Sequence, residues 1–197
     1  MNDLDAVRET LNGNSDAFSV IVKRYTPVIY RLAYRMSESN DPAAEAEESV
    51  QEIFLNAYSH LNTFNIRYKF YSWLYTIALN YLRSLRRKNK FAGIFSFVSY
   101  DDAVHSSEGE SLFSFSGSPE EISINMEAEQ FVMKALKMLK TGEREVFILR
   151  QIENMTVDET AEILRIPHGT VKNRLHRARK ELSAIMKKWH WDDREII

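Results

Sequence analysis

Apolar side chains recur at helical spacing through the first half of the chain, and this pattern predicts three helices. The first lies within Asp16 to Met36, where Pro27 is expected to kink or break it. The second runs from Asp41, a favourable N-cap residue before a proline, to about His60. The third runs from Phe70 to Lys88 and has one apolar side. These helices make up a predicted first domain, residues 1–90.

The helical period fails in residues 91–120, which are rich in Ser, Gly, Asp and Glu and are predicted to be a linker. The linker also carries apolar side chains that are expected to dock on another surface: Phe91, Ile94, Phe95, Phe97, Tyr100, Phe113 and Phe115. The period returns in residues 121–190, the predicted second domain, and residues 191–197 form a short tail. Both domains are helical, so the expected fold class is all-α.

Four helices are predicted in the second domain. One ends near Thr141, and the next begins at Glu143 and runs through Arg150. Thr156, with Glu159 three residues later, has the sequence of a capping box that opens a short helix. The last helix begins near Gly169 and carries a stripe of regularly spaced apolar residues: Val171, Leu175, Ala178, Leu182 and Ile185.

Composition supports a helical protein of the cytosol. Six Gly and four Pro are few for an all-β chain, and 44% hydrophobic with 27% charged residues is typical of soluble proteins. The absence of cysteine excludes disulfides, thiolate metal sites and cysteine nucleophiles. The acidic start of the sequence is followed by no apolar run of signal-peptide or transmembrane length, so a cytoplasmic location without membrane insertion is expected.

The net charge of −2 conceals an uneven distribution. Residues 62–90 contain Lys and Arg and no acid, whereas residues 91–133 contain acids and no Lys or Arg. Basic residues dominate again in residues 165–188, where Glu181 is the one acid. Two basic blocks separated by an acidic one are compatible with solvated helix faces, or with two sites that bind nucleic acid.

The segment from Thr156 to Lys180 has the pattern of a helix-turn-helix: a short capped helix, a turn that contains Pro167, and a longer helix. Thr170, Lys172, Asn173 and His176 lie away from the apolar stripe and are expected to meet base edges. The cations beside them are expected to meet phosphates: Arg174, Arg177, Arg179 and Lys180. The alternative is an ordinary helical hairpin with a solvated basic face.

The third helix of the first domain carries a row of polar and aromatic residues opposite its apolar side: Trp73, Thr76, Asn80, Arg83 and Arg87. An aromatic ring can stack on an unpaired base while the cations hold the backbone, so the row suits single-stranded DNA. Trp73 alone would more often be a half-buried packing residue. A third cluster opens the second helix and consists of Glu45, Glu47, Glu48, Gln51 and Glu52. These acids could bind a protein, or serve only the helix dipole.

Three segments in this order and spacing resemble the extracytoplasmic-function sigma factors of bacteria. They are Glu47-Glu-Ser-Val-Gln-Glu-Ile-Phe, Phe70-Tyr-Ser-Trp-Leu-Tyr-Thr-Ile-Ala-Leu-Asn and Gly169-Thr-Val-Lys-Asn-Arg-Leu-His-Arg-Ala-Arg. The resemblance covers both domains. It implies an alternative sigma factor, a transcription initiation factor that binds core RNA polymerase and directs it to promoter DNA.

The resemblance also implies roles for particular residues. Glu48, Gln51, Glu52 and Phe54 match the segment that grips the β′ clamp of the polymerase. Trp73, Tyr75, Asn80 and Arg83 match the part that melts and reads the minus-10 element, so the expected minus-10 set is Trp73, Tyr75, Thr76, Asn80, Arg83 and Arg87. Thr170 to Arg179 match the helix that reads the minus-35 element, beside the polymerase β flap. The acidic linker is similar to the segment that enters the RNA exit channel.

The loop before Phe70 departs from the family. Relatives commonly have an Arg-Gly-acid run there, whereas this chain has Asn65-Ile-Arg-Tyr-Lys, so the minus-10 specificity of relatives does not carry over. The family also implies an anti-sigma partner, no cofactor or metal, and a monomer when free of polymerase.

Two other classes of function are alternatives to a sigma factor. The sequence lacks the motifs expected of an enzyme. The five His have no paired metal-binding spacing, and the chain has no Gly-rich phosphate loop. The stronger alternative is a stand-alone regulator that binds an operator through the helix-turn-helix. Such a regulator would be expected to be a dimer on a palindrome, whereas a sigma factor needs polymerase.

Overall fold

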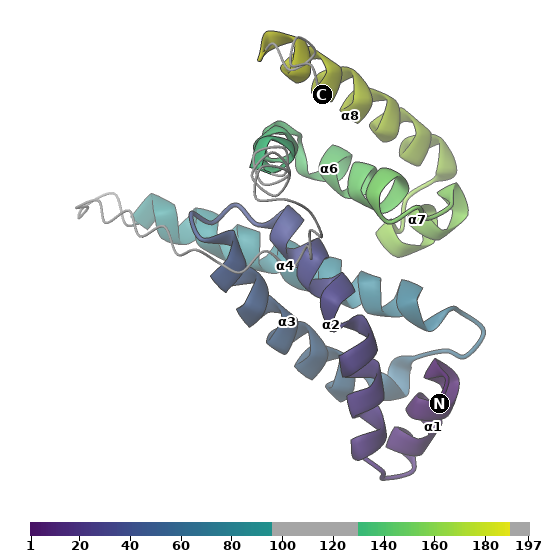
Figure 1. Cartoon of the computed structure of the whole chain (residues 1–197). Coiled ribbons are helices and arrows are strands. Elements are labelled where there is room, and N and C mark those ends of the chain that lie inside the picture. Colours follow the sequence, from purple (N-terminus) through teal and green to yellow (C-terminus); the bar gives the residue numbers. More distant parts are fainter. Residues whose placement is uncertain (96–129, 190–197) are drawn as a thin grey trace, which may run out of the picture. The chain divides into compact units, whose positions relative to one another are not determined.

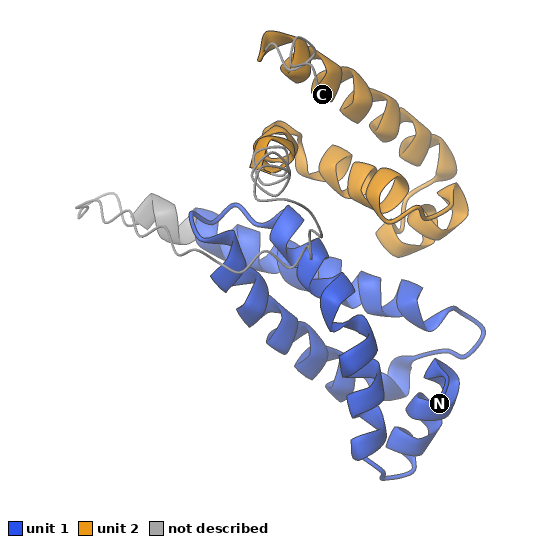
Figure 2. Ribbon diagram, viewed as in Figure 1, with its two compact units in different colours: residues 1–110 blue, residues 111–197 orange. Residues whose placement is uncertain are grey.

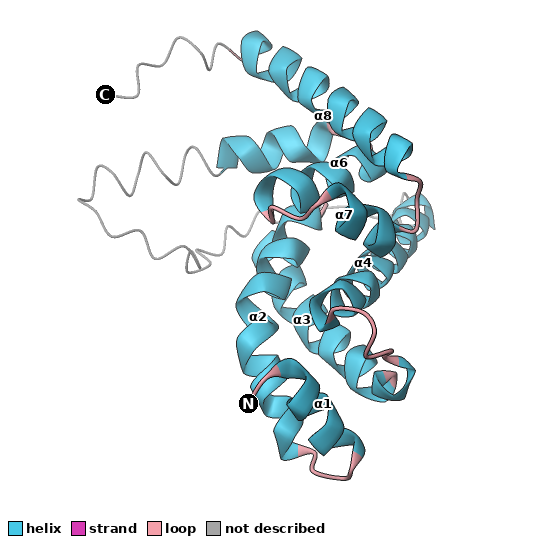
Figure 3. Ribbon diagram, turned by 90° about the vertical axis from the view of Figure 1, so that its right-hand side faces the viewer, coloured by secondary structure: helices cyan, strands magenta, loops and turns pink. Residues whose placement is uncertain are grey.

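The computed structural model describes residues 1–95 and 130–189, and every regular element in these two ranges is a helix (Figure 3). The all-α prediction is confirmed. The chain divides into two compact units, residues 1–110 and 111–197 (Figure 2). The predicted docking of Phe97, Tyr100, Phe113 and Phe115, the start of the helix at residue 121 and the tail at 191–197 lie outside the described residues.

The first unit contains α1 (Asp3–Leu11), α2 (Asp16–Met36), α3 (Pro42–Ser59), the 3₁₀ turn η1 (Leu61–Thr63) and α4 (Phe70–Phe95) (Figure 1). Helix α2 contacts α1, α3 and α4 and is the centre of the unit. The apolar stripes bury one side chain after another along these helices, including Ile21, Leu32, Ile53, Leu74 and Ala78, all with 0% exposure. Burial of these stripes is the main favourable term that holds the unit together.

Helix α3 begins as predicted. The Asp41 side chain accepts a hydrogen bond from the Ala44 N–H at 3.0 Å, and Pro42 occupies the first turn, where its missing N–H has no cost. Helix α4 is longer than predicted, because it continues to Phe95, past residue 91 where the linker was expected to begin.

Pro27 was expected to kink or break its helix, and it does not break it, since α2 is continuous from Asp16 to Met36. A kink at Pro27 stays a prediction. Proline removes one N–H donor, and the helix tolerates the loss because buried side chains such as Ile21 and Ile29 hold it on both sides of Pro27. Packing therefore outweighs a local preference.

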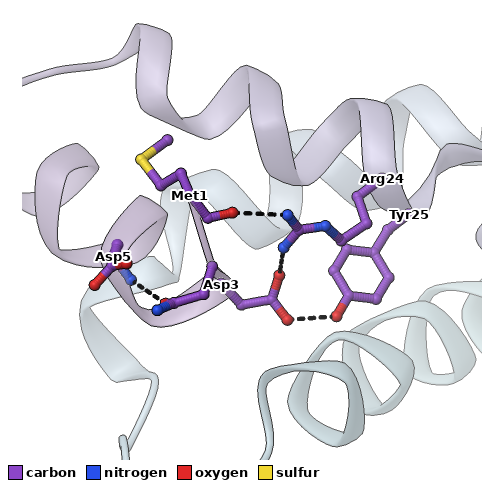
Figure 4. Close-up of polar contacts among 6 residues, drawn as sticks. Met1, Asp3, Asp5, Arg24 and Tyr25 are labelled. Atoms are coloured by element: carbon purple, nitrogen blue, oxygen red, sulfur yellow. Dashed lines mark hydrogen bonds and ion pairs between the residues drawn. The ribbon is translucent and has the colours of Figure 1, made fainter.

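Helix α1 was not predicted. It docks on α2 by burying Ala6, Val7 and Thr10, and through polar contacts of Asp3 with Arg24 and Tyr25 (Figure 4). Asn2 caps the helix, accepting a hydrogen bond from the Asp5 N–H at 2.9 Å.

The second unit contains helical residues 130–138, α6 (Thr141–Phe147), the π-helical turn η2 (Ile148–Ile152), α7 (Val157–Leu164) and α8 (His168–Lys188). The helix predicted from Glu143 to Arg150 is thus α6 followed by η2. Helix α8 contacts α6 and α7. Its predicted stripe is confirmed, because Val171, Ala178 and Ile185 are buried, with Leu175 and Leu182 half-buried between them.

Within residues 1–95 and 130–189, none of the helices combines the length and hydropathy that crossing a membrane requires.

Candidate functional site

The predicted row on α4 forms one surface of the first unit. Asn80 and Arg87 are exposed, and Trp73, Thr76 and Arg83 are half-buried. Arg83 Nη1 lies 3.4 Å from Asn80 Oδ1, so the amide and the guanidinium share one face of the helix. The structure thus brings together five of the six residues predicted to contact minus-10 DNA.

Tyr75 is the sixth member and is placed differently. Its side chain is 3% exposed, so it has little surface to offer a ligand. Its predicted contact with DNA remains a prediction, and it is the member of the set that this structure supports least.

An aromatic cluster holds the Trp73 ring at the start of α4. The ring centroid lies 5.6 Å from that of Phe64 and 5.4 Å from that of Phe70, which are themselves 5.3 Å apart. Phe64 and Phe70 are buried, so they fix one side of the indole while part of it stays accessible. The arrangement suits a base that stacks on a ring held in place.

The loop between Phe64 and Phe70 adds exposed residues that the sequence reasoning did not include in the site. Ile66 is 58% exposed and Tyr68 is 54% exposed, and Arg67 is exposed between them. The sequence signal was the departure of this loop from the family pattern, but the pattern alone does not show which side chains face water.

In the second unit, α7 and α8 form the predicted helix-turn-helix. The capping box is confirmed: the Glu159 N–H donates to Thr156 Oγ1 at 3.1 Å, and the Thr156 N–H donates to Glu159 Oε2 at 2.9 Å. Pro167 occupies the N-cap position of α8, and Lys172 and Asn173 in the first turns of that helix are exposed. This is the geometry that a helix needs in order to enter a major groove.

The turn between α7 and α8 contains a strained residue. Arg165 has φ 54° and ψ 48°, a left-handed conformation that favours glycine. The Ile166 N–H donates to the Ala161 carbonyl at 3.1 Å, so the turn closes the helix in the manner of a Schellman motif.

We therefore expect Arg165→Gly to raise the free energy of unfolding of the second unit by about 1 kcal/mol, because a side chain in this conformation costs roughly that amount. Thermal denaturation of the full chain measures the change. Arg165→Ala is the control, since it removes the charge and keeps the Cβ. Equal stability of the Gly and Ala variants would contradict the strain argument.

The residues predicted to contact minus-35 DNA lie along α8. Lys172, Asn173, His176, Arg177, Arg179 and Lys180 are exposed, and Thr170 is half-buried. Arg179 Nη2 donates to Gln151 Oε1 at 2.7 Å, so this guanidinium is already held on its own unit. Base-edge candidates and cations therefore occupy the same side of one helix.

Arg174 is half-buried and lies over the first turn of α6. A Cβ atom placed on Gly142 would meet Arg174 Nη1 at 2.8 Å, which shows how closely the guanidinium approaches that turn. Arg174 therefore packs against the first turn of α6, in addition to its predicted contact with a DNA phosphate.

The acidic cluster on α3 is mostly open to solvent. Glu48, Gln51 and Glu52 are exposed, whereas Glu45 accepts a hydrogen bond from Asn89 Nδ2 at 3.0 Å. Burial, and then the negative charges of Glu52 and Glu48, raise the pKa of Tyr81 on α4 above its ordinary value. The cluster is thus a negative surface where α3 lies beside α4.

Phe54 is the one predicted polymerase contact that the structure places inside. It is 6% exposed, and its ring lies 6.5 Å from that of Phe18. Leu55, one residue later, is 63% exposed and continues the face of Glu48, Gln51 and Glu52 at helical spacing. The sequence reasoning missed Leu55, because the apolar period of the helix does not single it out.

Among the described residues, no group of three or more His, Asp or Glu is arranged to hold a metal ion.

Two family models match this chain. Sigma-70 region 2 matches residues 21–91, which hold α3 and most of α4, and sigma-70, region 4 matches residues 132–182, which hold the helix-turn-helix. The two models therefore cover both of the predicted DNA-binding surfaces and the acidic surface of α3.

Two proteins with similar sequences are named as ECF RNA polymerase sigma factors. The chain is 34% identical over 180 residues to the ECF RNA polymerase sigma factor SigW of Bacillus subtilis (strain 168), with 89% of this chain and 92% of that protein covered. It is 29% identical over 182 residues to the ECF RNA polymerase sigma-E factor of Escherichia coli (strain K12), with 92% of this chain and 93% of that protein covered.

Two solved structures are similar along most of the chain. One is CnrH in complex with the cytosolic domain of CnrY, with a TM-score of 0.66 and 26% identity over 94% of this chain and 97% of that chain. The other is the sigma factor RpoE in complex with the anti-sigma factor NepR from Bartonella quintana, with a TM-score of 0.65 and 25% identity over 86% of this chain and 96% of that chain.

Proposed function

Since this chain belongs to the extracytoplasmic-function group of the sigma-70 family, we propose that three exposed surfaces divide its work between polymerase and the two promoter elements. The protein is an alternative sigma factor, which binds core RNA polymerase and directs promoter-specific initiation of transcription. Its family consists of initiation factors that are not enzymes. The stand-alone regulator is not favoured, because both region 2 and region 4 are present.

The α4 surface is assigned to the minus-10 element. The observation that carries this assignment is the Trp73 ring, held on one side by Phe64 and Phe70 and followed along α4 by Asn80 and Arg83. An unpaired base could stack on the ring, while the amide reads its edge and the guanidinium neutralises the backbone.

The α8 surface is assigned to the minus-35 element, with the first turns of the helix in the major groove beside the β flap of polymerase. The exposure of Lys172, Asn173 and His176 supports this assignment. The α3 surface, with Glu48, Gln51, Glu52 and the exposed Leu55, is assigned to the β′ clamp. Because Phe54 is buried, it would support this surface from below.

An anti-sigma protein is proposed as a further partner, since two similar structures are complexes and one of them holds an anti-sigma factor. It would act by covering one of these surfaces. Free of such partners and of polymerase, the chain is proposed to be a monomer in the cytoplasm.

Run-off transcription with purified core polymerase and genomic fragments tests these assignments. Wild type is expected to produce new starts, and Asn80→Ala and Asn173→Ala are each expected to weaken them by roughly 5- to 150-fold, the effect of losing a good contact to one base. Asn14→Ala, which removes an exposed amide in the turn before α2, is the matched control and is expected to leave the starts unchanged.

Different results would remove different parts of the proposal. If both variants initiated as well as wild type, the two reading surfaces would be wrongly placed. If the protein produced no new starts but bound a palindrome tightly without polymerase, the stand-alone regulator would replace the sigma factor.

A further inference from the structure

Helix α1 is fastened to α2 by one carboxylate (Figure 4). Asp3 Oδ1 pairs with Arg24 Nη1, and Asp3 Oδ2 accepts a hydrogen bond from the Tyr25 hydroxyl at 2.6 Å. Arg24 Nη2 also donates to the Met1 carbonyl oxygen at 2.8 Å. Both oxygens of Asp3 are therefore engaged by adjacent residues of α2, and we refer to Asp3, Arg24 and Tyr25 as the α1 latch.

The latch is needed to place α1, because the helix has only 9 residues. Isolated helices of this length are marginal in water, so α1 is held by what it contacts. It buries three small or medium side chains, Ala6, Val7 and Thr10. The contacts of Asp3 add to this small apolar contact and fix the start of α1 on α2.

Tyr25 connects the α1 latch to the aromatic cluster of Phe64, Phe70 and Trp73. The Tyr25 ring, whose hydroxyl binds Asp3, lies 5.8 Å from the ring of Phe70. Phe70 in turn contacts Trp73 and Phe64. A chain of contacts thus runs from Asp3 to the indole that is proposed to receive an unpaired base.

Helix α1 also contacts η1, which leads into the loop between Phe64 and Phe70. The loop is therefore held at both of its ends, by α1 at η1 and by Tyr25 at Phe70. Between these ends, Ile66 and Tyr68 are exposed. A loop whose ends are fixed loses less conformational entropy when it closes on a ligand.

We propose that Asp3 and Tyr25 are positioning residues for promoter melting, which hold the loop between Phe64 and Phe70 and the Trp73 ring ready for the unpaired strand. This inference rests on the proposed role of α4 at the minus-10 element. It gives α1 a function in DNA opening, although α1 lies outside the residues matched by the region 2 model.

The hydrogen bond from the Tyr25 hydroxyl to the Asp3 carboxylate does not depend on pH in the range where transcription is measured. Burial, and then the hydrogen bond to the Asp3 carboxylate, raise the pKa of Tyr25 above its ordinary value. The hydroxyl therefore keeps its proton and remains a donor to Asp3 at every pH at which transcription is measured.

The test compares holoenzymes assembled from full-length Tyr25→Phe, Asp3→Asn and the double variant. Tyr25→Phe keeps the ring against Phe70 and removes only the hydroxyl. The unpairing of minus-10 thymines is followed by permanganate reactivity on a duplex promoter, and affinity for core polymerase is measured separately. We expect the double variant to open the promoter about tenfold more slowly, the typical weight of a hydrogen bond to a charged group, with unchanged affinity for core polymerase.

Asp5→Asn is the matched control, because Asp5 is an exposed acid in the same first turn whose side chain is outside the latch. It is expected to open the promoter at the wild-type rate. Asp3→Glu, which retains a carboxylate, is expected to recover part of the lost rate.

The results separate this inference from the function on which it rests. Wild-type opening by the double variant, together with slow opening by Asn80→Ala, would overturn the latch and leave the α4 surface in place. Wild-type opening by Asn80→Ala and Trp73→Ala as well would overturn both. A parallel fall in core affinity, thermal stability and opening would show that the latch only stabilises the fold, and would also overturn the proposal.

Discussion

Reversing the charges of Glu48 and Glu52 together, to Lys, is expected to weaken the affinity of the protein for core RNA polymerase by about 100-fold, because the acidic α3 surface is proposed to pair with cations of the clamp, and each reversal would then face a like charge. Both side chains are exposed on α3, so the fold does not depend on them. Titration of a fluorescently labelled chain with core polymerase measures the affinity. The weakening is expected to shrink as salt is added, since exposed charges are screened.

Glu9→Lys is the control for this experiment. Glu9 is an exposed acid on α1 in the same unit, and its reversal changes the net charge without touching the α3 surface. It is expected to bind core polymerase as wild type does. Equal losses for Glu9→Lys and for the α3 variant would mean that overall charge, rather than the α3 surface, guides binding, and the clamp assignment would fail.

Much of the fold could be predicted from the sequence, because local signals and buried stripes agree at most helix ends. Asp41 caps α3, Thr156 and Glu159 form the capping box of α7, and the stripe that includes Val171 and Ile185 is buried. Each of these features depends on residues that lie within one or two helical turns of one another, so the sequence pattern alone can predict it.

The features that sequence reasoning missed depend on contacts between distant residues. Helix α1 is short and is placed by the latch to Arg24 and Tyr25, more than twenty residues away. Helix α2 stays continuous through Pro27, because packing on both sides holds it. No local pattern reports either contact.

The same limit applies to the functional surfaces. On α3 the family resemblance included Phe54 in the polymerase-binding set, although its side chain is buried, and did not include Leu55, which is exposed. On α4, periodicity identified the row of Trp73, Asn80 and Arg83. It did not predict that the Phe64 ring, on the other side of the loop before α4, packs against Trp73. Sequence thus predicted which helices carry the surfaces, and the structure was needed to show which side chains each surface presents.

Val171→Asp is expected to prevent the second unit from folding while the first unit keeps its structure. Val171 has 0% exposure at the contact of α8 with its neighbours, and a buried carboxylate without a partner costs several kcal/mol, which is comparable to the whole stability of a small unit. Backbone NMR spectra of the full chain measure the effect. Amide signals of residues 130–189 should collapse toward random-coil positions, and those of residues 1–90 should stay where they are.

Lys172→Asp supplies the same carboxylate one residue later, where the side chain is exposed. It is expected to fold as wild type does and to lose only affinity for the minus-35 element, because a cation expected to meet base edges becomes an anion beside the negatively charged DNA. With Val171→Asp, binding to core polymerase through α3 should persist while starts that need the minus-35 element disappear. If the signals of residues 1–90 collapsed as well, the two predicted domains would be one cooperative unit, and the surfaces on α4 and α8 could not be assigned to separately folded domains.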